Sequence, residues 1–74
     1  MRDEQFTLIG RQPVLEAYRS GQTVDRLFVQ EGLREGTLSS ILREARRQST
    51  PLDFVKRSRL DEMSGGENHQ GVMA

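Results

Sequence analysis

The sequence predicts a small α/β domain: a three-layer α/β/α sandwich with a mostly parallel or mixed sheet. Three observations lead to this fold class. Short β-prone runs alternate along the chain with stretches whose apolar residues recur at helical spacing. Glycine or proline marks most of the boundaries between these segments. A chain of 74 residues supports one small core, because only roughly 60–65% of its unfolded surface is buried on folding.

The first half of the chain is expected to form a strand, a helix and a second strand. Residues 6–9 are a β-prone run that ends at Gly10. A helix is predicted to begin at Pro13, because the fixed φ of proline suits the first helical position, and to end at a glycine cap, Gly21. Residues 24–29 are apolar at several consecutive positions, which predicts a second strand buried on both faces.

The second half begins with the clearest amphipathic helix of the chain. Thr37 is a good N-cap, and Pro51 stands beyond the predicted end of the helix. Between them, four apolar residues fall on one helical face: Leu38, Ile41, Leu42 and Ala45. Residues 52–56 form the third predicted strand.

A short helix and a final strand complete the expected order. Ser58 and Asp61 resemble the two ends of a capping box, so this helix is expected to open at Ser58. It is expected to end at the pair Gly65-Gly66. Residues 69–74 are interpreted as a loop that leads into a last strand.

Composition excludes several classes of site and of location. The chain has no Cys, which removes disulfides, zinc knuckles and thiol nucleophiles, and its one His cannot build a His-rich metal site. No apolar run approaches the ~20 residues that span a bilayer, and the first residues lack the apolar segment of a signal peptide. We therefore expect a cytoplasmic protein that binds neither membrane nor metal.

The charged residues argue against recognition by bulk charge. The 11 basic residues balance 11 acidic ones, so no global positive field attracts nucleic acid or anionic lipid. Ten of the 11 basic residues are Arg, whose planar fork grips phosphate or carboxylate with two hydrogen bonds. The codon usage of a GC-rich genome would produce the same bias, so composition alone leaves the function open.

The sequence lacks the motifs of a self-contained enzyme. Neither the Gly-x-Gly-x-x-Gly fingerprint nor the loop Gly-x-x-x-x-Gly-Lys-Ser/Thr occurs. The single candidate base, His69, lies in a glycine-flanked tail, where a structural hydrogen bond suits it better than general-base catalysis. Asp61 and Glu62 are adjacent in a helix and cannot face each other as an acid–base pair. We therefore expect no catalytic residue in this chain and no cofactor bound to it.

The junction between the first strand and the first helix is the first candidate binding site. Gly10 allows a close approach, and Arg11 and Gln12 lie at the turn before the helix. A helix N-terminus offers free N–H groups and a partial positive charge, which together attract anions. Arg11 would add a full charge at the same place. The alternative is that these residues only start a helix.

A ridge of arginines on the exposed side of the second helix is the other candidate. The ridge consists of Arg43, Arg46 and Arg47. Its first and last members are one helical turn apart. The helix dipole also stabilises cations near a helix C-terminus, and Glu44 partly neutralises these, so a solvated helix face is the alternative. Arg57 and Arg59 make a weaker pair, because neighbours around a helix start point in different directions.

Three motifs occur in an order that resembles a known family. They are Gly10-Arg11-Gln12-Pro13-Val14-Leu15-Glu16-Ala17, then Leu60-Asp61, then His69-Gln70-Gly71-Val72-Met73-Ala74. Together they resemble the N-terminal substrate-binding domain of SpoU-type tRNA/rRNA 2′-O-ribose methyltransferases, over nearly the whole chain. The resemblance implies a flexible N-terminus over residues 1–5 and an RNA substrate-binding domain over residues 6–74.

The resemblance also implies a fold similar to that of ribosomal proteins that bind kinked RNA. In those proteins a Gly-x-Asn-Glu segment at a helix start makes the main RNA contacts, and residues 10–13 occupy the corresponding place. Here Gln12 replaces the Asn and Pro13 replaces the Glu. With the arginine ridge included, the expected RNA-binding residues are Gly10, Arg11, Gln12, Arg43, Arg46 and Arg47.

The family further implies partners and a cofactor outside this chain. Its catalytic half, a knotted α/β domain expected downstream of Ala74, binds S-adenosylmethionine and methylates a ribose 2′-hydroxyl, commonly as a dimer. The expected function is therefore to position rRNA or tRNA for that methyltransferase domain. Two alternatives stay open. One is an independent kinked-RNA-binding protein, complete at this length; the other is a structural or protein-interaction module, which zero net charge also suits.

Overall fold

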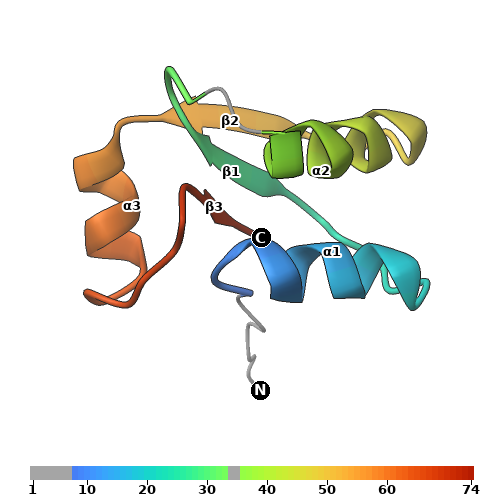
Figure 1. The fold of residues 1–74 in the computed structure, drawn as a ribbon, viewed down its shortest axis with the longest axis horizontal. Coiled ribbons are helices and arrows are strands. Elements are labelled where there is room, and N and C mark those ends of the chain that lie inside the picture. Colours follow the sequence, from blue (N-terminus) through green and yellow to red (C-terminus); the bar gives the residue numbers. More distant parts are fainter. Residues whose placement is uncertain (1–7, 34–35) are drawn as a thin grey trace.

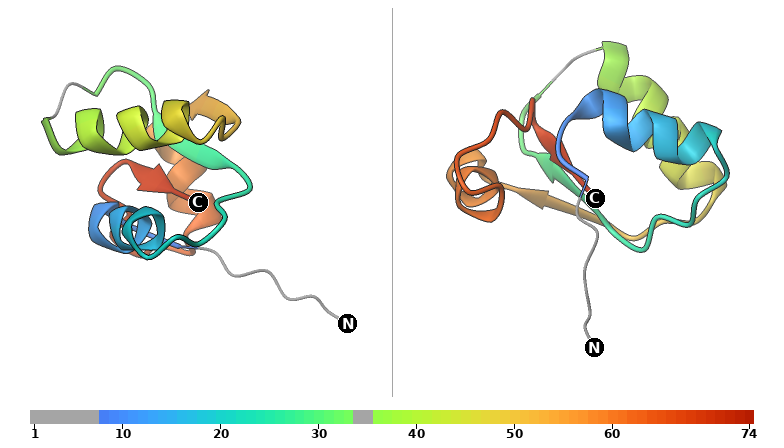
Figure 2. Two further views of the ribbon diagram at one scale, coloured as in Figure 1. Left: turned by 90° about the vertical axis from the view of Figure 1, so that its right-hand side faces the viewer. Right: turned by 90° about the horizontal axis from the view of Figure 1, so that it is seen from below.

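Helices and strands alternate along the chain, as the sequence predicts. The computed structural model describes residues 8–33 and 36–74. Its elements are α1 (Arg11–Arg19), β1 (Leu27–Gln30), α2 (Gly36–Arg47), β2 (Leu52–Val55), α3 (Arg57–Met63) and β3 (Val72–Met73). The sheet lies between α3 on one side and the pair α1 and α2 on the other (Figures 1 and 2). The predicted α/β fold class is confirmed.

The sheet is mixed, with β1 at its centre. The strand order is β2-β1-β3, and β1 runs parallel to β2 and antiparallel to β3. Residues 6–7 of the first predicted strand lie outside the described residues, while Ile9 forms a bridge with Met73. Because β1 and β2 are parallel, with Gln30 opposite Val55, both strands end at the same edge of the sheet.

The main core lies between the sheet and the helices α1 and α2. Leu27 and Val29 are buried on one face of β1, whereas Phe28 and Gln30 are half-buried on the other, so the prediction of a strand buried on both faces was too strong. The buried cluster consists of Val14, Leu15, Tyr18, Leu27, Val29, Leu38, Ile41, Ala45 and Val72. On the edge strand β2, Phe54 keeps 55% of its surface exposed.

The helix α1 begins two residues earlier than predicted. Its first residue is Arg11, with Pro13 inside the first turn, where the missing N–H of proline costs little. The predicted glycine stop is present: Gly21 follows the C-cap Ser20, has a φ of 83°, and donates its N–H to the Tyr18 carbonyl at 3.2 Å.

Three other predicted boundaries were wrong. The strand β1 begins at Leu27, three residues after the predicted start. The helix α2 already includes Gly36, so Thr37 is inside the helix and is not its N-cap. The helix α3 begins at Arg57, and its N-cap Lys56 makes no side-chain cap hydrogen bond. A capping box that opens at Ser58 is therefore not formed.

The described helices set limits on two kinds of site. None of them is long and apolar enough to cross a membrane. Within residues 8–33 and 36–74, no group of three or more His, Cys, Asp or Glu side chains could hold a metal ion.

Candidate nucleic-acid interface

A pocket lies where the end of β1, the start of α1 and the loop between α3 and β3 meet. Its volume is about 350 Å³. The polar residues that line it come from all three segments and from α3; they include Arg11, Gln30, Arg57, Asp61, Asn68 and Gln70. The pocket therefore combines two arginines with amide and carboxylate groups at one edge of the sheet.

Arg11 is fixed at this pocket by two hydrogen bonds to Gln70. Its backbone N–H donates to Gln70 Oε1 at 3.1 Å, and its Nε–H donates to the Gln70 carbonyl at 2.9 Å. Gln70 itself has a φ of 54°, the left-handed conformation that few non-glycine residues adopt. The loop before β3 thus orients the Arg11 guanidinium, and this pre-organisation reduces the entropy lost when the guanidinium binds an anion.

The start of α1 offers fewer backbone donors than the sequence suggests. Gln70 already accepts the Arg11 N–H, Pro13 has no N–H, and the Val14 N–H donates to the Gly10 carbonyl at 3.4 Å. Among the described residues, Gln12 is the position in the first turn whose N–H has no partner. Attraction of an anion at this junction therefore depends mainly on the Arg11 side chain.

Gly10 contributes to the site through its backbone. It is buried, has a φ of 105°, and donates its N–H to the Val72 carbonyl at 3.1 Å. A Cβ at this position would lie 3.4 Å from Gln70 Oε1, the atom that accepts the Arg11 N–H. That distance is an ordinary contact, so it is the φ of 105°, which side chains rarely adopt, that favours glycine at this position.

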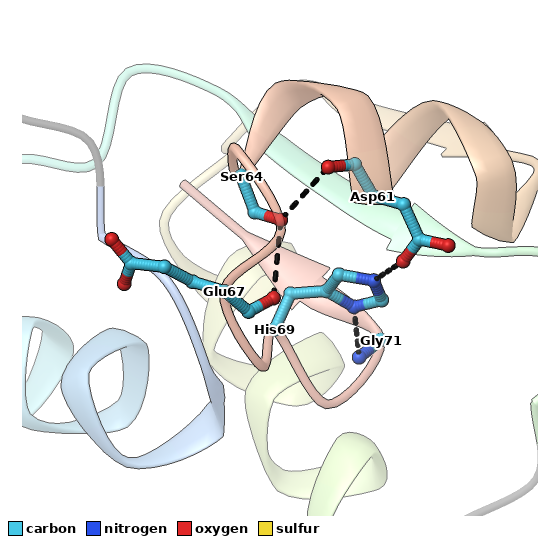
Figure 3. Close-up of polar contacts among 5 residues, drawn as sticks. All are labelled: Asp61, Ser64, Glu67, His69 and Gly71. Atoms are coloured by element: carbon cyan, nitrogen blue, oxygen red, sulfur yellow. Dashed lines mark hydrogen bonds and ion pairs between the residues drawn. The ribbon is translucent and has the colours of Figure 1, made fainter.

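His69 has the structural role that the sequence favours. The Gly71 N–H donates to His69 Nδ1 at 2.8 Å, and His69 Nε2 lies 2.7 Å from Asp61 Oδ1 (Figure 3). Because a backbone N–H only donates, Nδ1 is the acceptor and the ring proton is on Nε2, which donates to Asp61. His69 is 6% exposed, and its ring joins α3 to the loop.

The same loop is braced a second time by Ser64. The Ser64 hydroxyl lies 3.2 Å from the Asp61 carbonyl and 3.1 Å from the Glu67 carbonyl, and it donates to one of them at a time (Figure 3). Together with the His69 contact, it ties the loop that lines the pocket to α3.

The structure does not bring the arginine ridge to the pocket. Arg43, Arg46 and Arg47 are exposed, as predicted, but they lie in the last two turns of α2. The helices α1 and α2 end at the same side of the molecule (Figures 1 and 2), whereas the residue of α1 that lines the pocket, Arg11, is at the start of that helix. A hydrogen bond of 2.9 Å between Tyr18 and Thr50 joins their ends. At about 1.5 Å per residue, the length of α1 separates the two basic regions by more than ~10 Å.

Arg57 lies at the pocket, although the sequence predicts only a weak basic pair of Arg57 and Arg59. Arg57 lines the pocket, whereas Arg59, with which it was paired, does not. A signal was present in the sequence: Arg57 and Gln30 stand at the carboxyl ends of neighbouring parallel strands, and ligands of α/β sheets gather at that edge. The sequence does not predict a place at the pocket for Asn68 and Gln70, because only the folded loop brings them there.

Comparisons with known proteins assign the family. Residues 7–74 match the profile described as RNA 2′-O ribose methyltransferase substrate binding. A protein of Staphylococcus haemolyticus, named for the TrmH family of tRNA/rRNA methyltransferases, is 37% identical over 71 residues. Proteins of the same name from Staphylococcus epidermidis and Staphylococcus saprophyticus are each 32% identical over 71 residues. The alignments cover 96% of this chain but only 28% of each relative. The chain belongs to the SpoU family of RNA methyltransferase substrate-binding domains.

Proposed function

We propose that this domain recognises tRNA or rRNA for an S-adenosylmethionine-dependent 2′-O-ribose methyltransferase. The catalytic domain is proposed to lie downstream of residue 74 in the same protein. Two findings support this: the family description names RNA 2′-O ribose methyltransferases, and the relatives are named as tRNA/rRNA methyltransferases. The chain spans 28% of the length of those relatives, so most of each relative lies outside the region that this domain matches.

The observation that carries the proposal is the anchored arginine at the pocket. Gln70 holds the Arg11 guanidinium at the pocket, and Arg57 lines the same pocket from the start of α3. Guanidinium groups bind phosphate oxygens in charge-assisted, often bidentate hydrogen bonds. An RNA phosphate is therefore the ligand that best suits this pair of side chains.

The contribution of the domain to the reaction is positioning. S-adenosylmethionine, bound to the catalytic domain, supplies the methyl group. RNA held by this domain presents its ribose in a fixed orientation, so that the encounter with the methyl donor becomes effectively intramolecular. His69 does not act as a base in this scheme, because both of its ring nitrogens already have partners.

Substitution of Arg11 tests the proposal. Arg11→Ala is expected to weaken binding of tRNA or of rRNA fragments by about 1–3 kcal/mol, because a charge-assisted contact is lost. The backbone N–H that Gln70 accepts is retained in the variant, so circular dichroism and thermal unfolding should report an intact fold. Filter binding or fluorescence anisotropy with the 74-residue chain measures the affinity.

The matched control is Arg19→Ala, which removes an exposed arginine from the other end of the same helix. Its effect on RNA affinity should be smaller than that of Arg11→Ala. Equal affinities of wild-type chain and Arg11→Ala would remove the helix start from the binding site.

A further inference from the structure

The strand β2 is an open edge of the sheet. In the strand order β2-β1-β3 it has β1 as its one neighbour, and no other strand of the described residues pairs with its outer side. On the inner side, the Glu31 N–H donates to the Val55 carbonyl at 2.8 Å. Because the backbone groups of successive residues point to opposite sides of a strand, the N–H and C=O groups of Leu52 and Phe54 point away from β1. These backbone groups are available to a further strand.

This edge lacks the features that usually keep an exposed strand from pairing. Natural edge strands carry prolines, bulges or unpaired charges, which hinder contact with another chain. Pro51 and Lys56 lie just outside the strand, one on either side. The one charged residue within it is Asp53, whose Oδ2 lies 2.6 Å from Arg26 Nη1, so that charge has a partner in the same molecule. Phe54 adds an aromatic ring that is more than half exposed.

The sequence of β2 is complementary to a second copy of itself. Two copies can align as antiparallel strands with their Phe54 residues opposite each other, so that each Phe54 N–H donates to the Phe54 carbonyl of the other copy. This register sets Asp53 opposite Val55 and brings the two aromatic rings together on one face as a cross-strand pair. A register centred on Asp53 would instead oppose two carboxylates, which repel. Zero net charge leaves no long-range repulsion between the copies.

We propose that two copies of this domain pair through the outer side of β2, as antiparallel strands centred on Phe54. The pairing joins the two three-stranded sheets into one continuous sheet. Because β2 has only four residues, the contact is small, and the dissociation constant is expected to be on the order of 0.1–1 mM. The inference goes beyond the proposed function and does not rest on it, since no residue of β2 lines the pocket.

Sedimentation equilibrium of the 74-residue chain, from micromolar to millimolar concentrations, measures the association. The wild-type chain should show a monomer–dimer equilibrium. Phe54→Lys should raise the dissociation constant at least about tenfold, because it removes the aromatic pair and opposes two positive charges at the centre of the contact. Gln22→Lys is the matched control, because it adds the same charge at an exposed position outside the sheet, and it should leave the constant unchanged. Phe54→Tyr, which keeps the ring, should retain the dimer.

Two further measurements test the role of the backbone. Phe54→Pro removes an N–H that points away from β1, so it should abolish pairing between copies while the bonds to β1 are kept. Circular dichroism checks that this variant folds; if it does not, Phe54→Lys decides alone. In NMR spectra of the wild type, dilution should move the amide signals of Leu52 and Phe54 more than those of Asp53 and Val55, whose N–H groups point toward β1.

Three results would overturn the inference. The first is a chain that stays monomeric up to about 1 mM. The second is a dimer that Phe54→Lys weakens no more than Gln22→Lys, because the contact would then lie elsewhere. The third is a dilution series in which the amide signals of β2 do not move. None of these results bears on RNA recognition, which the Arg11→Ala variant tests separately.

Discussion

Gln70 and His69 do most to shape the pocket, although neither was expected to bind RNA. Gln70 joins the start of α1 to a loop 59 residues away in the sequence. His69 joins α3 to the same loop through Asp61. The residues that we propose to contact RNA and the residues that hold them in place are therefore different sets. A substitution at His69 should act on stability first and on RNA binding only through the loop.

His69→Ala should lower the free energy of unfolding by about 1–3 kcal/mol. The substitution removes the acceptor of the Gly71 N–H, and that N–H is buried, so it would be left without a partner. Urea unfolding followed by circular dichroism at a fixed pH measures the change.

Asp61→Asn is the control for this prediction. Its side-chain oxygen still accepts the His69 Nε2–H, and the side chain of Asp61 is 55% exposed, so the loss of charge should change stability by less than ~1 kcal/mol. A His69→Ala chain as stable as wild type would refute the structural role of the ring.

At the scale of elements, periodic segments were predictable and their boundaries were less so. The four apolar residues of α2 and the alternation of strands with helices follow from local spacing. The capping box at Ser58 is not formed because α3 already begins at Arg57, and the Asp61 side chain contacts His69, eight residues further on, which only the folded chain brings near. The pocket could be anticipated only in part. Arg57 follows a strand end, but the positions of Asn68 and Gln70 depend on how the loop folds.

The arginine ridge of α2 gives a second prediction at this scale. Replacing Arg43 and Arg46 together by Ala should weaken binding to different RNAs by similar amounts, because phosphate contacts carry no sequence information. If both arginines contact phosphates, the slope of log K against log[salt] should become shallower by about 1–2. Arg47 is left in place because its Nε lies 3.7 Å from Glu44 Oε1.

The arginine ridge either contacts phosphates or is a solvated helix face. RNA affinity of the wild type and of the double variant, measured over a range of salt concentrations, distinguishes these two roles. A slope that does not change would assign these arginines to a solvated helix face. The pocket would then remain as the proposed RNA contact.

For the whole molecule, zero net charge limits how RNA can be bound. A neutral domain has no long-range field to attract a polyanion, so recognition must come from a few placed side chains and from shape. Arg11 lines the pocket at the start of α1, whereas the arginine ridge is at the end of α2, which lies beside the end of α1 (Figures 1 and 2), so an RNA that contacts both must follow the length of α1. The affinity of the isolated domain should accordingly be modest and depend on RNA structure.

The salt dependence of RNA binding by the wild-type chain tests the central claim most directly. If two to four phosphates are neutralised, log K should fall linearly with log[salt], with a slope of roughly −1.5 to −3.5. A slope in this range for structured tRNA or rRNA fragments is the predicted result. A flat response, or no binding, would contradict RNA recognition and favour a protein-contact role, for which the exposed Phe54 on β2 is the natural starting point.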